Sequence, residues 1–99
     1  MNKEDKELIR DYMGLNFNPA RVSSYEHENG REFHFNLNDA GLCVKEMQRQ
    51  EDWDDFITYA EADDTSKQCH TWSQFFAWLY NADNFFESMA KWLKEEENG

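Results

Sequence analysis

The sequence predicts an α+β domain that is mainly α, with four to five helices packed around an aromatic core and one small β-hairpin. Apolar residues recur at helical spacing in several segments, and an Asn-Gly step separates two segments typical of strands. Aromatic residues make up 16% of the chain, and each buries a large area, so a few of them stabilise a small core. Because 99 residues suffice for one core only, we expect a single domain over residues 1–99.

The first expected helix covers residues 3–13. Its apolar residues, from Leu8 to Met13, recur at helical spacing, and acidic and basic residues fill the other face. Gly14 is suited to end this helix, because glycine adopts the left-handed conformation at low cost. Residues 15–20 contain the single proline of the chain, Pro19, and are expected to form a connection.

Residues 22–37 are expected to form the hairpin. Asn29-Gly30 is the preferred two-residue turn, because both of its positions need a positive φ. Pairing around this turn sets Glu26 opposite Phe33. Alternate side chains of the second strand then share one buried face, namely Phe33, Phe35 and Leu37. A two-stranded hairpin is marginally stable by itself, so this one is expected to pack against a helix.

Four more helices are expected, over about residues 39–50, 52–62, 72–80 and 84–96. Asn38 or Asp39 is expected to cap the first of them, and Thr71 the third. Residues 63–70 are polar and predict a loop. Residues 81–83 are expected to break the helical pattern between the last two helices.

Half of the sixteen aromatic residues fall in the twenty-one residues from Trp72 to Trp92. Most of these side chains are expected to form the core. The aromatic residues of the 72–80 helix nevertheless cover more than one narrow stripe, and a helix that is apolar on most sides is either central or in contact with a partner. We therefore hypothesise that the surplus forms a homodimer interface or an exposed binding patch.

The net charge of −11 argues against direct binding to nucleic acid and to membranes, since both require clusters of Lys and Arg. Residues 51–64 contain seven acidic and no basic residues. The plain interpretation is a solvated surface, and acids in the first turn of a helix also favour its dipole. The alternative is an acidic face that binds a protein with a basic surface. Its candidate residues are Asp54, Asp55, Glu61, Asp63 and Asp64.

No pattern in the chain indicates catalysis, a metal or a cofactor. Residues 63–67 lack the alternating ligands and the Gly of an EF-hand loop, and no histidine or cysteine has a recognised zinc spacing. Cys43 and Cys69 are expected to be small buried hydrophobes, and a disulfide between them stays open. We expect a protein that is not an enzyme and has no cofactor. The alternative is a small enzyme that uses Cys69 or one of the histidines, His27, His34 and His70.

Neither a signal peptide nor a transmembrane segment is indicated by the sequence, which predicts a cytoplasmic protein. Residues 8–14, Leu-Ile-Arg-Asp-Tyr-Met-Gly, resemble the opening of many short reading frames of bacteriophages and prophages. This resemblance implies an accessory protein of a bacterial mobile element and brings no catalytic residue or known activity.

These observations together predict a non-enzymatic protein-binding accessory factor. In its most specific version, the protein is a phage-type inhibitor that mimics the charge of nucleic acid and binds a partner with a basic surface. The alternative is a homo-oligomeric structural protein that uses its aromatic helices as the interface.

Overall fold

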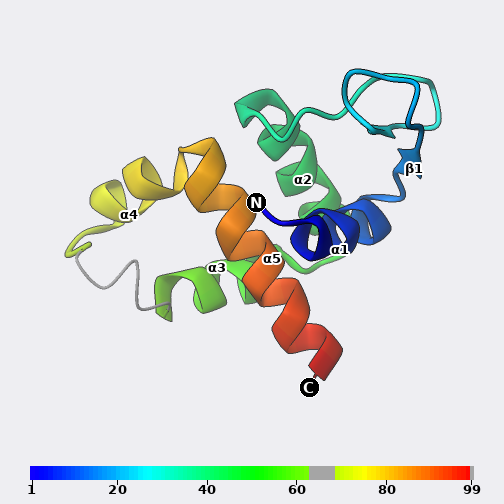
Figure 1. Cartoon of the computed structure of the whole chain (residues 1–99). Coiled ribbons are helices and arrows are strands. Elements are labelled where there is room, and N and C mark those ends of the chain that lie inside the picture. The colour runs from blue at the N-terminus through cyan, green and yellow to red at the C-terminus, as the bar shows by residue number, and fades with distance from the viewer. Residues whose placement is uncertain (63–68, 99) are drawn as a thin grey trace.

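The computed structural model describes residues 1–62 and 69–98. In this part of the chain, five helices and one pair of short antiparallel strands are present, so the predicted fold class is confirmed (Figure 1). The helices are α1 (Lys3–Met13), α2 (Leu37–Arg49), α3 (Trp53–Ala62), α4 (Trp72–Leu79) and α5 (Ala82–Asn98), and the strands are β1 (Asn16–Phe17) and β2 (Tyr25–Glu26). The long helix α5 crosses the middle of the molecule and contacts each of the other four helices.

Aromatic side chains of α5 form the centre of the core, as predicted. Phe86 is fully buried, and its ring centroid lies 5.9 Å from that of Phe33, in the segment that precedes α2. Phe56 of α3 lies 5.6 Å from both Phe85 and Trp92, again measured between ring centroids. Such inclined ring pairs add roughly 0.5–1.5 kcal/mol each beyond the area that they bury.

The first helix has the predicted limits. Asn2 caps it, because its side-chain oxygen accepts a hydrogen bond from the Asp5 N–H at 2.8 Å. Gly14 ends it with φ 68°, the left-handed conformation expected of a C-terminal glycine. Thr71 caps α4 as predicted, accepting from the Gln74 N–H at 3.1 Å.

Two other helices begin two residues earlier than predicted. The cap of α2 is Asn36 rather than Asn38 or Asp39, since its side-chain oxygen accepts from the Asp39 N–H at 2.9 Å. The start of α5 is Ala82, because Asn81 accepts from the Asn84 N–H at 3.2 Å. Residues 81–83 therefore hold the junction of α4 and α5, but they begin the second helix rather than separating the two.

The predicted hairpin register is wrong by one residue. Glu26 pairs with Glu32 instead of Phe33, and the His27 N–H donates to the Arg31 carbonyl at 2.8 Å. The loop therefore has three residues, 28–30. Gly30 has φ 86°, whereas Asn29 lies outside the left-handed region. A three-residue hairpin loop needs only one left-handed residue, and Gly30 supplies it.

The regular strand pairing also lies elsewhere. β1, in the segment predicted as a connection, pairs with β2 so that Phe17 faces Tyr25. Phe33 is fully buried as predicted, but Phe35 has φ 56° and interrupts the extended backbone. Leu37 consequently belongs to α2, where it is 38% exposed.

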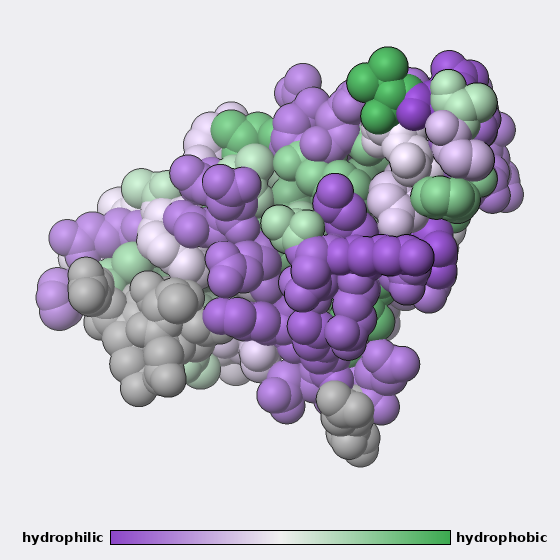
Figure 2. Space-filling view, in the orientation of Figure 1, coloured by the Kyte–Doolittle hydropathy of each residue, from purple (hydrophilic) through white to green (hydrophobic). Residues whose placement is uncertain are grey.

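The outer surface is predominantly polar on the side shown in Figure 2, where hydrophilic residues cover the lower half and apolar residues show mainly in the upper half. Among the described residues, no helix combines the length and the apolar character that crossing a bilayer requires.

Candidate protein-binding surface

An open groove with a volume of about 480 Å³ lies between α2 and α4. Its described lining consists of aliphatic and aromatic side chains, of which Tyr80 carries a hydroxyl, and contains no charged side chain. Leu37, Gly41 and Val44 of α2 form one wall, while Phe76 and Ala77 of α4, followed by Tyr80, form the other. Trp53 of α3 and Phe85 of α5 also line it, so four of the five described helices meet here. A concave apolar site of this size falls within the range of about 300–1,000 Å³ typical of binding pockets.

The helix α4 leaves large aromatic side chains at the surface beside this groove. Phe75 and Leu79 face the core and are nearly fully buried. Trp72, Phe76 and Tyr80 lie on another side of the helix and are 58%, 46% and 76% exposed. They follow one another at intervals of four residues, so they form one continuous stripe, which we call the aromatic stripe. The core therefore uses only part of the aromatic surface of α4.

The acidic residues predicted as a binding face are divided by the structure. Asp54 and Glu61 are exposed on α3 and are seven residues apart, which puts them on one side of the helix about 10 Å apart along its axis. Asp55 is exposed as well, but its carboxylate accepts a hydrogen bond from the indole N–H of Trp92 at 2.9 Å. Asp63 and Asp64 lie outside the described residues.

Asp52 and Asp55 each hold α3 against another helix. The hydrogen bond from Trp92 lowers the pKa of Asp55, and a further hydrogen bond with Glu96 raises the pKa of the Glu96 carboxyl. Asp52 accepts from the Tyr12 hydroxyl at 2.8 Å. Burial, followed by that hydrogen bond, raises the pKa of Tyr12 above its ordinary range. These two carboxylates thus contribute to the packing of α3 against α1 and α5.

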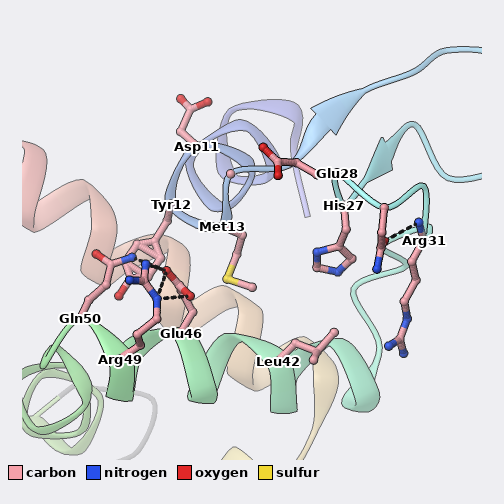
Figure 3. A pocket seen from close by; sticks show the side chains of 12 residues that line it. Asp11, Tyr12, Met13, His27, Glu28, Arg31, Leu42, Glu46, Arg49 and Gln50 are labelled. Carbon is pink, nitrogen blue, oxygen red and sulfur yellow. Dashed lines mark hydrogen bonds and ion pairs between the residues drawn. The ribbon is translucent and has the colours of Figure 1, made fainter.

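A second, polar cavity of about 660 Å³ lies between the end of α1, the hairpin loop and α2 (Figure 3). On one side of it, Glu46 forms an ion pair with Arg49 and accepts from the Gln50 side chain at 2.8 Å. The hydrogen bond from Arg49 lowers the pKa of Glu46. On the other side, the buried Nε2 of His27 has no hydrogen-bond partner among the described residues. The Glu46 and Arg49 side chains on the first side of the cavity are thus already paired with each other.

The residues considered for an enzyme or a metal site are dispersed. Cys43 and Cys69 carry free thiols, which answers the question of a disulfide between them. Cys43 is fully buried, and this burial raises the pKa of its thiol. His34 forms an ion-pair contact with Glu32 at 3.2 Å, on the outside of the hairpin segment. In residues 1–62 and 69–98, no group of three His, Cys, Asp or Glu side chains is arranged to hold a metal ion.

Comparisons of the chain with protein-family models, with curated proteins and with solved structures gave no match. Sequence reasoning identified the aromatic surplus of α4 but missed the wall that α2 contributes. The available signal was Gly41, a glycine inside an otherwise regular amphipathic helix.

Proposed function

We propose that this protein is a non-enzymatic protein-binding factor that receives apolar side chains of a basic partner in the groove between α2 and α4. The observation that carries this proposal is the exposed aromatic stripe, Trp72, Phe76 and Tyr80, of which Phe76 and Tyr80 line that groove. Large contiguous apolar surfaces on otherwise polar proteins mark interaction sites, and aromatic residues are enriched at the centres of interfaces.

The charge around the groove favours a basic partner. The exposed acids that adjoin the lining residue Trp53 in the sequence are Glu51 and Asp54, while one exposed base, Lys45, follows the lining residue Val44. Asp55, Asp83 and Glu87 are equally near in the sequence, but Asp55 bonds to Trp92, and Asp83 and Glu87 line a separate cavity with Asp5. The whole chain carries −11, so a partner with a basic surface is attracted from a distance and correctly oriented before the apolar contact forms. Asp54 and Glu61 would extend this attraction along α3.

One version of the proposal follows from the resemblance to reading frames of bacteriophages and prophages. The basic surface would then be one that normally binds nucleic acid, and the protein would act as an inhibitor by covering it. The acidic character of the chain supports this version, because it reproduces the sign of the phosphate backbone.

The exposed aromatic stripe also favours a second candidate, a homo-oligomer in which two copies meet through the same groove around a two-fold axis. The two candidates respond oppositely to salt. Screening weakens the attraction of a basic partner, whereas it relieves the repulsion between two copies that each carry −11.

Affinity capture from a lysate of the cell that carries the gene tests the proposal. The double variant Trp72→Ala/Tyr80→Ala should lose the captured partner and keep its fold, since both side chains are mostly exposed. Val22→Ala is the matched control, because Val22 is 96% exposed but lies far along the chain from the groove-lining residues. Equal capture by the double variant and the wild type would reject the proposal.

A further inference from the structure

We propose that the segment received by the groove is an amphipathic α-helix of the partner, with apolar anchors spaced over two turns and Lys or Arg at its flanks. This inference rests on the proposed function and names the chemistry of its partner.

Gly41 is the most informative residue of the groove. Glycine is among the least favourable residues inside a helix, and Gly41 lies in the middle of α2. Its φ is not in the left-handed region, and a Cβ added there would meet no atom within 4 Å. Neither the backbone nor the packing of this chain therefore requires a glycine at this position. A missing side chain on a groove wall does, however, permit the close approach of another backbone.

The dimensions of the groove suit a helix. Along α2, the lining residues run from Leu37 to Val44, which is about 10 Å at 1.5 Å per residue. Helical anchors at positions i, i+3 or i+4, and i+7 cover the same length. The small lining residues come from both walls, Ala40 and Gly41 from α2 and Ala77 from α4, where they leave room for the body of a helix.

The backbone of the walls argues against an extended segment. A strand that binds by β-augmentation needs an exposed sheet edge whose N–H and C=O groups are unpaired. Both long walls of this groove are helices, and their backbone groups bond within the helix. A helical occupant satisfies its own backbone in the same way, so it only has to supply side chains.

The flanking charges follow from the surroundings of the groove. Its lining contains no charged side chain, so the face of the helix that enters must be apolar. Asp54 is exposed and follows the lining residue Trp53 in the sequence, and the whole chain carries −11. Basic side chains at the flanks of the entering helix would therefore be attracted to this acidic protein without entering the apolar lining.

A synthetic probe tests this inference by fluorescence anisotropy and circular dichroism. The probe is a fluorescein-labelled 15-residue peptide with Leu at positions 4, 8 and 11 and Lys at its flanks. The wild-type protein should bind it, and the peptide should gain helical signal on binding. A peptide with Glu in place of every Lys, and a peptide with Pro at its centre, should each bind at least tenfold more weakly.

Gly41→Phe is the decisive variant. It fills the groove from its own wall, and it should fold because Phe is more favourable than Gly in a helix and the added Cβ meets open space. We expect at least tenfold weaker binding of the Lys peptide. Thr58→Phe is the control, since it adds the same side chain at an exposed position of α3 that lies about 140° around the helix from the lining residue Trp53, and it should bind as the wild type does.

The outcomes separate this inference from the proposed function. Unchanged peptide binding by Gly41→Phe, or equal binding of the Glu and Lys peptides, would overturn the inference. So would light scattering that shows a wild-type dimer dissociated by Gly41→Phe, because the occupant would then be a second copy. If capture of the natural partner is lost in Trp72→Ala/Tyr80→Ala but kept in Gly41→Phe, the protein-binding role stands and the helical occupant is rejected.

Discussion

Replacing Asp55 by Ala should destabilise the fold clearly more than replacing its neighbour Asp54 by Ala. Both residues lie in the first turn of α3, where a carboxylate contributes roughly 0.3–1 kcal/mol through the helix dipole. Only Asp55 also accepts the 2.9 Å hydrogen bond from the Trp92 indole. A hydrogen bond to a charged group contributes about 1.5–3 kcal/mol, and we take about 1 kcal/mol because Asp55 is exposed to solvent.

Urea denaturation followed by circular dichroism measures the two variants under the same conditions. We expect a difference of about 1 kcal/mol between them, which corresponds to a difference in Tm of roughly 4–8 °C for a domain of this size. In a chain that also carries Trp92→Phe, Asp55→Ala and Asp54→Ala should have nearly equal free energies of unfolding. Trp92→Phe removes the hydrogen-bond donor, while the ring contact with Phe56 is largely retained. Equal stabilities of Asp55→Ala and Asp54→Ala at pH 7 would refute the assigned role of Asp55.

The pH dependence gives a second check on the same hydrogen bond. Trp92 lowers the pKa of Asp55 in the folded state below its ordinary value of about 3.9. The stability that this contact supplies is therefore fully present above about pH 4 and is lost as the pH falls through the lowered pKa. In a chain that also carries Glu96→Ala, which removes the carboxyl whose raised pKa acts in the opposite sense, the difference between the Asp55 and Asp54 variants should accordingly be constant near neutral pH and should close in strong acid. A difference that grows on acidification would contradict this sign.

Three further predictions follow from burial and backbone conformation. Phe86→Ala should cost about 3–5 kcal/mol because Phe86 is fully buried, whereas Phe76→Ala should cost under about 1 kcal/mol, both measured by urea denaturation. Cys43, in a chain whose other cysteine is replaced by Ser, should react with a thiol reagent only as fast as the protein unfolds, since burial raises its pKa and blocks access. Gly30→Ala should lower the free energy of unfolding by about 1–2 kcal/mol, because Gly30 has a positive φ. Asn29→Gly should not raise the stability, because Asn29 lies outside the left-handed region; in a two-residue turn, where this position needs a positive φ, it would.

The helices were predictable because their signals are local. Asn2, Gly14 and Thr71 act on residues three or four positions away, so a linear sequence shows both partners of each interaction. The two helices that begin earlier than predicted, α2 and α5, each have more than one possible cap residue within three positions. In α2 the cap is Asn36, whereas Asn38 or Asp39 was expected. The Asp39 carboxylate is instead engaged with the preceding segment, where it accepts from the His34 N–H at 2.6 Å.

The hairpin register and the groove could not be derived from the sequence. An Asn-Gly step suits a two-residue loop, but a three-residue loop needs only Gly30. The structure has the three-residue loop, with the fully buried Phe33 packed against Phe86. The groove depends on how α2 and α4 approach each other around α5, and these two helices are separated by more than twenty residues. The sequence showed that α4 had surplus aromatic surface, without showing what lay beside it.

The most direct test of the groove is a titration of the Lys-flanked Leu peptide into the ¹⁵N-labelled protein, followed by NMR. Binding in the groove predicts saturable shift changes of the Gly41, Val44 and Ala77 amides, together with the side-chain N–H of Trp53. The hairpin-loop amides around Gly30 should stay unchanged. Shift changes confined to that loop, or to the Asp54 and Glu61 side of α3 without Gly41, would contradict the account.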